Sequence, residues 1–90
     1  MSSDDNVANA RAMRIRWRCR RGIRELDIIL TRFLDSEYNG LTAEQQDAME
    51  SLLSQPDPQL IDWLMRKEAP SDESIYKLVE RIRATAGNRA

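Results

Sequence analysis

Apolar residues recur at intervals of three and four along most of this chain, which is the spacing of one face of an α-helix. The longest such run predicts a helix from about Arg21 to Tyr38, with a broad apolar arc formed by Ile23, Leu26, Ile29, Leu30, Phe33, Leu34 and Tyr38. The opposite side of this helix carries Arg21, Glu25, Ile28 and Arg32. Ile28 is therefore an apolar residue among charged ones. It is either an ordinary exposed side chain or the contact point of a binding surface.

The preceding segment predicts a first helix from about Val7 to Arg18, on which three stripes share the helical spacing. The first stripe is apolar and comprises Ala10, Met13 and Trp17. The second is a weaker apolar stripe of Ala8, Ala12, Ile15 and Cys19. The third is basic and comprises Arg11, Arg14, Arg18 and Arg21. We expect Trp17 to anchor the core or its edge, whereas the basic stripe is either a solvated face or a face kept for a partner.

Gly22 falls where these two helices meet. Glycine inside a helix costs about 0.5–1 kcal/mol relative to alanine, so its presence indicates a break between helices or a close approach of another backbone. We expect a turn near Cys19 and Arg20, followed by the second helix from Arg21. Arg21 and Glu25 would then be one helical turn apart and able to pair, although with the arginine first this is the weaker orientation.

Three shorter helices complete the chain. Asn39-Gly40 ends the second helix, and Thr42 with Gln45 has the spacing of a capping box at the start of the third. Pro56 stops that helix, Asp57-Pro58 starts the fourth, and Ser71 or Asp72 caps the fifth, which ends at Gly87. Their apolar faces are formed by Met49, Leu52 and Leu53, by Leu60, Ile61, Leu64 and Met65, and by Ile75, Leu78, Val79, Ile82 and Ala86. Trp63 lies to one side of the fourth helix, where packing against a neighbouring helix is favoured over a partner contact.

These elements predict an all-α fold in which residues 1–90 form a single small domain, a compact five-helix bundle with short loops. No segment alternates in the manner of a β-strand. The polar residues 1–6 and the residues 87–90 are expected to be flexible termini. No apolar run approaches the roughly 18 residues that a membrane span needs, so we expect no membrane insertion.

The side-chain chemistry of the chain argues against an enzyme. The sequence has no histidine, which removes the commonest general base and metal ligand. We therefore expect no catalytic residues and no metal site.

Cys19 is the only cysteine, which excludes an internal disulfide and fits the bacterial cytoplasm. With no base nearby, Cys19 is interpreted as a small, half-buried apolar residue rather than a redox thiol or nucleophile.

Charge is strongly segregated along the chain although the net charge is only −1. Residues 11–24 hold seven arginines and no acid, whereas residues 25–90 hold thirteen acids against seven basic residues. Such segregation predicts a local electropositive face that steers an acidic partner.

The segment from Arg14 to Asp27 resembles the signature of the SdhE family, the FAD assembly factors of succinate dehydrogenase and fumarate reductase. The family hallmark, R-G-x-x-E, stands here as Arg21, Gly22 and Glu25. The similarity continues in Asp57-Pro58, in the run from Asp62 to Met65 and in the proline-led last helix, and so covers nearly the whole chain.

This resemblance implies a five-helix factor that binds the flavoprotein subunit of succinate dehydrogenase or fumarate reductase and promotes covalent attachment of FAD to a histidine of that subunit. No cofactor is expected to be bound stably by the factor itself, since the FAD belongs to the partner. The residues implied to contact the partner are Arg21, Gly22 and Glu25, with Arg14 and Ile23 beside them. We expect a monomer that binds no nucleic acid.

Two other functions remain open at this stage. Some members of the same family have been described as the antitoxin of a toxin pair, and an interaction protein of that kind could share every feature above. The arginine-rich segment could also neutralise phosphates in a nucleic-acid-binding module, although the domain is slightly acidic overall and carries no helix-turn-helix or similar motif.

Overall fold

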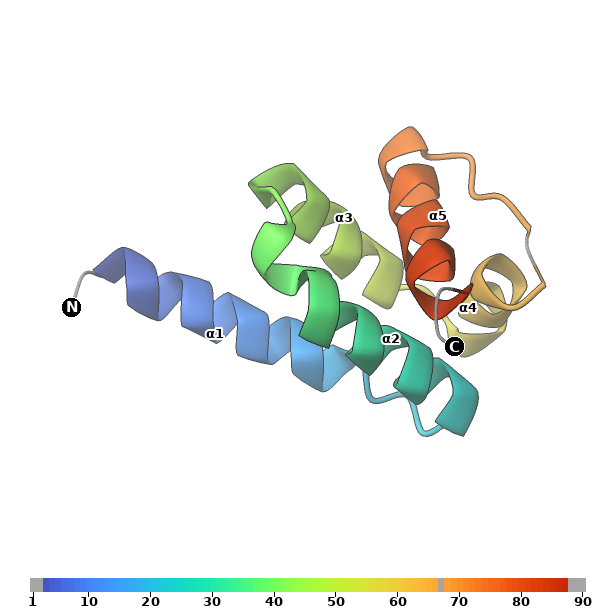
Figure 1. Ribbon diagram of the computed structural model, residues 1–90, viewed down its shortest axis with the longest axis horizontal. Helices are drawn as coiled ribbons and strands as arrows, with labels where there is room; N and C mark the ends of the chain where they lie inside the picture. Colours follow the sequence, from blue (N-terminus) through green and yellow to red (C-terminus); the bar gives the residue numbers. More distant parts are fainter. Residues whose placement is uncertain (1–2, 67, 88–90) are drawn as a thin grey trace.

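The computed structural model describes residues 3–66 and 68–87. These residues form five α-helices and one short 3-10 helix: α1 (Ser3–Arg18), α2 (Arg24–Glu37), η1 (Tyr38–Gly40), α3 (Ala43–Leu53), α4 (Asp57–Leu64) and α5 (Glu73–Gly87). No strand occurs within these ranges. The predicted all-α five-helix architecture is therefore confirmed (Figure 1).

The first two helices begin at other residues than the sequence predicts. α1 begins at Ser3, so residues 3–6 are helical rather than frayed. At the other expected flexible terminus Gly87 is the last residue of α5, and residues 1–2 and 88–90 lie outside the described residues. α2 begins at Arg24, three residues later than predicted, because Gly22 adopts a φ of 82° that no α-helix accommodates.

The caps of the shorter helices follow the sequence closely. The Thr42 hydroxyl accepts a hydrogen bond from the Gln45 backbone at 3.1 Å, and the Gln45 side chain accepts one from the Thr42 backbone at 2.9 Å, which completes the predicted capping box. Asp72, rather than Ser71, caps α5 by accepting from the Ile75 amide at 3.0 Å. The Asp57-Pro58 signal predicts Asp57 as the N-cap and Pro58 as the first helical residue, whereas the N-cap of α4 is Pro56 and the helix begins one residue earlier, at Asp57.

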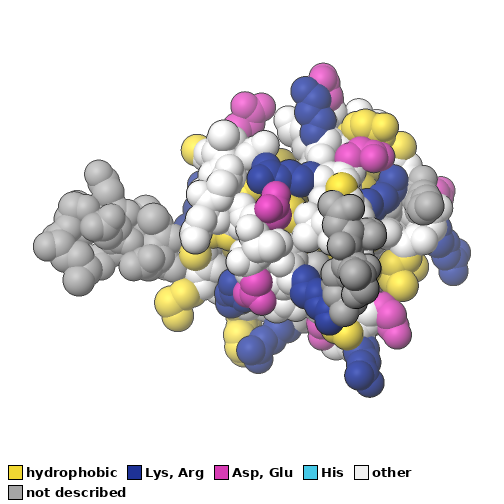
Figure 2. Space-filling view, in the orientation of Figure 1, with side chains coloured by type: hydrophobic (Ala, Val, Ile, Leu, Met, Phe, Trp, Pro, Cys, Tyr) yellow, Lys and Arg dark blue, Asp and Glu magenta, His cyan; other side chains and the backbone are white. Residues whose placement is uncertain are grey.

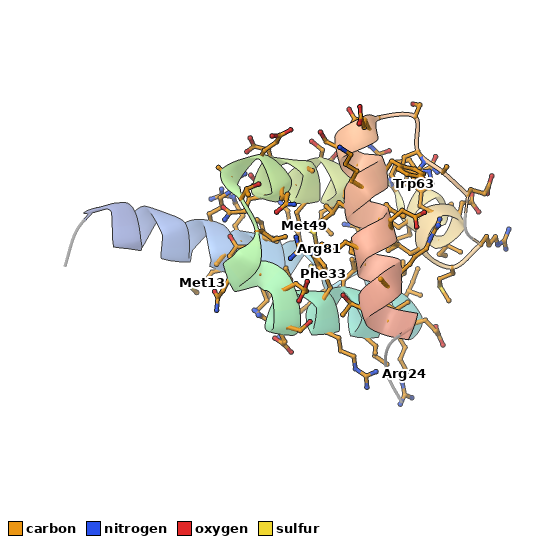
Figure 3. All side chains as sticks on the ribbon, turned by 45° about the horizontal axis from the view of Figure 1, so that its top comes forward. Met13, Arg24, Phe33, Met49, Trp63 and Arg81 are labelled. Carbon is orange, nitrogen blue, oxygen red and sulfur yellow. The ribbon has the colours of Figure 1, made fainter. Side chains whose placement is uncertain are left out.

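The core lies where α5 crosses the other helices. α5 packs against α2, α3 and α4, while α1 packs against α3. Figure 3 shows Phe33 of α2 and Met49 of α3 between the helices. The fully buried side chains larger than alanine are Ile15, Cys19, Leu26, Leu30, Phe33, Met49, Leu52, Leu60, Val79 and Ile82. The predicted apolar faces of α2, α3 and α5 therefore form the core, with Ile23, Ile29 and Tyr38 partly buried against it.

The interior face of α1 is the opposite of the one predicted. Ile15 and Cys19, from the weaker stripe, are completely buried, whereas Trp17 is 71% exposed, and the expectation that it anchors the core is wrong. Arg11 pairs with Asp47 and Glu50 of α3, and Arg11 and Ile15 are one turn apart on the same side of the helix. The rotation that lets Arg11 reach α3 therefore turns Ile15 inward and Trp17 outward. Apolar side chains accordingly protrude beneath α1 (Figure 2).

Trp63 is half-buried and packs against the core, as its predicted role in helix packing requires. Its backbone carbonyl accepts hydrogen bonds from the Arg83 guanidinium, which also donates to the Glu68 carbonyl at 2.8 Å. Arg83 thereby fixes the connection between α4 and α5 to the last turns of α5.

Burial changes the chemistry of Cys19. Removal from water raises the pKa of the Cys19 thiol from 9.0 to about 12, against the opposing influence of Arg16 and Arg21. At neutral pH the thiol is protonated and enclosed, which supports its interpretation as a small apolar residue.

We predict that Cys19 makes the fold sensitive to alkali. Because the folded pKa is raised, the unfolded chain loses the thiol proton first, so the contribution of Cys19 is complete below pH 9.0 and is lost as the pH rises towards 12. Urea unfolding between these pH values should show a steeper loss of stability for the unmodified protein than for Cys19→Ala. Parallel pH profiles for the two proteins would contradict this account.

Candidate partner-binding face

The loop between α1 and α2 occupies residues 19–23 and is set by hydrogen bonds at both ends. The Arg20 amide donates to the Trp17 carbonyl at 3.2 Å as α1 ends. Asp27, in the first turn of α2, accepts from the Arg21 amide at 2.7 Å. Gly22 lies between these points with its φ of 82°, in the left-handed region that residues with side chains rarely adopt. The predicted break between helices is therefore present.

Gly22 is glycine for conformational reasons and not for lack of room. A Cβ built at this position would have no atom within 4 Å, and the residue is exposed. The chain thus presents a patch of bare backbone to the outside, with space in front of it. Another molecule can approach the main chain at this point more closely than at any residue with a side chain.

Arg21 is occupied inside the protein. Its guanidinium donates to the Asp57 carboxylate at 2.8 Å, to the Leu53 carbonyl at 2.8 Å and to the Gln55 carbonyl at 2.7 Å. Its side chain is only 17% exposed. The predicted pairing of Arg21 with Glu25 along a helix is wrong, because Arg21 precedes α2 and its charge binds the end of α3 and the start of α4. A cation at a helix C-terminus also complements the helix dipole.

Glu25 and Ile28 lie on the outer side of α2. Both are exposed, as their positions opposite the apolar arc predict. Glu25 is in the first turn of α2, where a carboxylate suits the helix dipole, and it forms no ion pair with another described residue. Its carboxylate is thus available to an external hydrogen-bond donor.

The two remaining predicted contact residues have more structural roles. Ile23 is half-buried against the core and stands at the N-cap position of α2. Arg14 lies on α1 and pairs with Glu50 of α3 at 3.3 Å, with its side chain half exposed. The fold therefore brings Gly22 and Glu25 together on the surface, holds Arg21 and Ile23 beneath them, and places Arg14 on the neighbouring helix.

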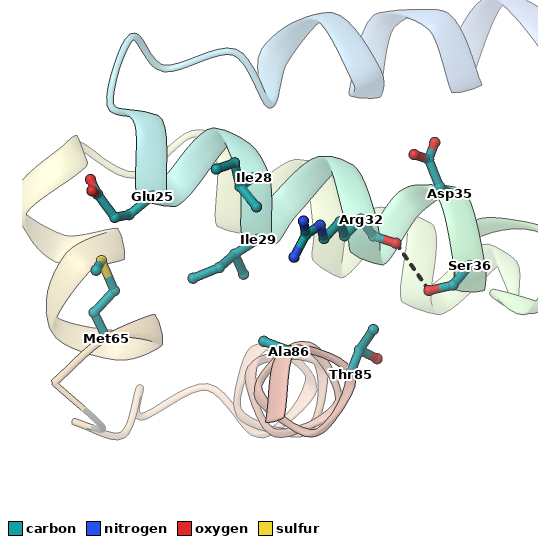
Figure 4. Close-up of a pocket in the computed structure, with 9 residues that line it drawn as sticks. All are labelled: Glu25, Ile28, Ile29, Arg32, Asp35, Ser36, Met65, Thr85 and Ala86. Atoms are coloured by element: carbon teal, nitrogen blue, oxygen red, sulfur yellow. Dashed lines mark hydrogen bonds between the residues drawn. The ribbon is translucent and has the colours of Figure 1, made fainter. Parts of the chain in front are cut away.

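A groove that the sequence does not predict adjoins Glu25. It has a volume of about 640 Å³ and runs between α2 and the last turns of α5, with the residue after α4 at one end (Figure 4). Its lining is formed by Glu25, Ile28, Ile29, Arg32, Asp35, Ser36, Met65, Thr85 and Ala86. Met65 was expected on the apolar face of α4, but it follows the helix and is 43% exposed. The isolated Ile28 was the only sequence signal for this groove.

Metal-binding clusters and membrane-spanning helices are both missing from the part of the chain that the structure describes. Within residues 3–66 and 68–87, His, Cys, Asp and Glu do not gather in the threes that a metal ion would require. None of the helices in these ranges has the length and apolar character needed to cross a membrane. The face around Gly22 offers backbone groups, one carboxylate and an apolar groove, which are the elements of a contact surface.

The sequence comparisons identify the family. Residues 13–86 match the family described as the flavinator of succinate dehydrogenase. The chain belongs to this family. The matched range includes the α1–α2 loop and all of α2, α3 and α4, so the surface around Gly22 lies within it. The resemblance of the R-G-x-x-E segment to this family is therefore confirmed.

Individual relatives are described as FAD assembly factors. The chain is 42% identical to the FAD assembly factor SdhE of Coxiella burnetii over 69 residues, which cover 77% of this chain and 84% of the relative. It is 42% identical to the FAD assembly factor SdhE of Yersinia pestis, covering 79% and 81% of the two chains. It is 41% identical to that of Legionella pneumophila (strain Lens), covering 83% and 94%. No solved structure gives a significant match to this chain.

We predict that Arg21 contributes more to folding than any other arginine of the α1–α2 loop. Replacing it with alanine leaves the Asp57 carboxylate and two carbonyls without their donor, and should lower the free energy of unfolding by about 2–4 kcal/mol. Arg20→Ala is the matched control, since it removes only an exposed guanidinium stacked on Trp17, worth about 0.5–1 kcal/mol. Urea unfolding of both variants measures these losses, and an equal loss of unfolding free energy in the two would contradict this role of Arg21.

Proposed function

We propose that this chain binds the flavoprotein subunit of succinate dehydrogenase, or of fumarate reductase, and promotes the covalent attachment of FAD to that subunit. Family membership supports the choice of partner. The observation that carries the location of the site is the exposed, positive-φ backbone at Gly22 beside the exposed carboxylate of Glu25. We place the protein in the bacterial cytoplasm, because its single cysteine excludes an internal disulfide and fits a reducing compartment.

The three residues of the motif have different tasks in this proposal. Arg21 acts from within, by fixing the loop to α3 and α4, so that the loop is already in its binding conformation before the partner arrives. Gly22 lets the partner's backbone or a flat side chain come close. Glu25 accepts charge-assisted hydrogen bonds from the partner, which are roughly twice as strong as neutral ones. A preorganised loop loses little entropy on binding.

The groove next to Glu25 extends this contact. Ile28 and Met65 are both exposed large apolar side chains, and Ile29 lies between α2 and α5 at the groove floor (Figure 4). An apolar side chain of the flavoprotein would bury these residues, while Glu25 and Arg32 fix its register with polar contacts. Apolar centres with polar rims are the usual anatomy of protein interfaces.

The chain promotes attachment without taking part in the chemistry. It has no histidine, and its single thiol is buried with a pKa of about 12, so it supplies neither the flavin acceptor nor an accessible nucleophile at neutral pH. The FAD and the acceptor histidine belong to the flavoprotein. Binding energy from the Gly22 face would favour the arrangement of the flavoprotein in which the flavin and its acceptor can react, which is a shift of population rather than acid–base catalysis.

We predict that Glu25→Gln impairs flavin attachment while leaving the fold intact. The amide keeps the shape of the side chain but loses its charge, so affinity for the apo-flavoprotein should fall by about tenfold or more. Covalent flavin on the subunit, measured by in-gel fluorescence in cells lacking the native factor, should fall with it. Glu44→Gln is the matched control, because Glu44 is also an exposed acid in the first turn of a helix, α3, and should have no effect.

Gly22 provides a second, steric test of the same face. Gly22→Arg fills the open space in front of the loop and should abolish attachment, whereas Gly22→Ala imposes mainly the backbone strain of a positive φ, about 1–2 kcal/mol. Thermal unfolding of both variants separates loss of fold from loss of binding. Normal flavin attachment with a folded Gly22→Arg protein would rule out this face as the contact site.

A further inference from the structure

The most exposed large apolar side chains of the described residues lie side by side on α1. Met13 is 72% exposed and Trp17 is 71% exposed, and they are four residues apart, on consecutive turns of one helix face. Figure 3 shows Met13 pointing away from the bundle. The ion pairs of Arg11 with α3 hold α1 in this rotation, so the exposure of both side chains is imposed by the packing of the helix.

Arg20 completes this surface. Its guanidinium lies over the Trp17 ring at 5.6 Å from the ring centroid, which is a cation–π contact. The contact covers one side of the indole and leaves the ring exposed as a flat, oriented plate. We call Met13, Trp17 and Arg20 the Trp17 platform.

The charge around the Trp17 platform is unbalanced. Arg11, Arg14, Arg16 and Arg21 pair with acids of α2, α3 or α4. By contrast Arg18, Arg20 and Arg24 are exposed, and none of them pairs with an acid in residues 3–66 or 68–87. Arg20 of the platform and Arg18, which follows Trp17 in the chain, therefore carry uncompensated positive charge beside two exposed apolar side chains, and Arg24 adds a further unpaired charge at the start of α2. The complementary surface is acidic with an apolar recess.

We propose that the Trp17 platform is a second contact surface for the flavoprotein, where it binds an acidic region of that subunit and seats the indole of Trp17 in an apolar recess. This inference rests on the proposed function, since it assigns a further surface to the same partner. Arg20 directly precedes Arg21 and Gly22, so the platform continues into the loop that the proposal above places at the interface. A single partner surface can therefore contact both.

The composition of the platform favours a protein over other partners. Trp, Met and Arg are the residue types enriched at protein interfaces, and Trp and Arg dominate their hot spots. A second copy of this chain would bring arginines against arginines. A bilayer surface calls for a longer apolar stripe than Met13 and Trp17 provide. Single-stranded nucleic acid is usually bound by several stacking aromatic rings, and this surface has one.

The apolar side chains of the platform and the unpaired arginines on and around it predict different kinetic effects. The arginines act at a distance, so they should accelerate association with an acidic surface in a manner that salt screens. Trp17 acts only at contact, so it should slow dissociation. Loss of each part is therefore measurable separately.

The test is surface plasmon resonance of the full chain binding to apo-flavoprotein at several salt concentrations. Trp17→Ala should weaken affinity about 30-fold, mostly through faster dissociation, and Met13→Ser should act in the same direction more weakly. Arg18→Gln/Arg20→Gln/Arg24→Gln should lower the association rate about tenfold at low salt and much less at high salt. The control is Tyr76→Ala/Lys77→Gln, which removes an exposed ring and a charge near the start of α5, far from the α1–α2 loop (Figure 1), and should change neither rate.

The outcomes distinguish this inference from the proposed function. If Trp17→Ala and the triple arginine variant bind like the unmodified chain while Glu25→Gln binds weakly, the platform proposal is wrong and the proposed function stands. If the unmodified chain does not bind the flavoprotein, both fail. Binding to RNA or to phosphatidylglycerol vesicles that Trp17→Ala abolishes, together with unchanged flavoprotein binding, would assign the platform to that other partner and overturn the proposal.

Discussion

The arrangement of this protein depends on the guanidinium of Arg21. Three helices end or begin within its reach: α1 ends just before it, α3 ends at the carbonyls it binds, and α4 begins with the carboxylate it pairs with. A planar group with five donors can satisfy such a set of acceptors at once, which a lysine ammonium cannot do with the same geometry. Because the side chain is mostly enclosed, these bonds are sheltered from competition with water.

The hydrogen bonds of Arg21 also explain how so small a protein can present a defined contact surface. A ninety-residue chain has a limited core, and a surface loop in such a chain would ordinarily sample several conformations. Here the loop is bonded to α2 through Asp27 and to α3 and α4 through Arg21. The exposed backbone at Gly22 and the carboxylate of Glu25 are consequently held in a fixed relation. The charge of Arg21 therefore fixes the loop, and Gly22 and Glu25 are the groups that remain accessible to a partner.

Much of the fold follows from the sequence because local signals and the apolar pattern agree. The capping box at Thr42 and the stripe from Ile75 to Ile82 each specify an element that the structure contains. The apolar pattern predicts too early a start for α2, because the φ of Gly22 cannot be read from the sequence. The exposure of Trp17 could not be predicted, since helix periodicity gives two apolar stripes on α1 but not the ion pairs with α3 that choose between them.

A position can require glycine because its φ is positive or because a side chain would not fit, and at Gly22 only the first reason applies. Its positive φ disfavours any L-amino acid, yet the space beside its Cα is empty, so the obstacle to a side chain within the protein is one of handedness and not of volume. A D-alanine at this position would relieve the backbone conflict while adding a methyl group to the outer surface. An L-residue at position 22 would therefore destabilise the fold itself. A D-residue would interfere only with a molecule that contacts the loop from outside.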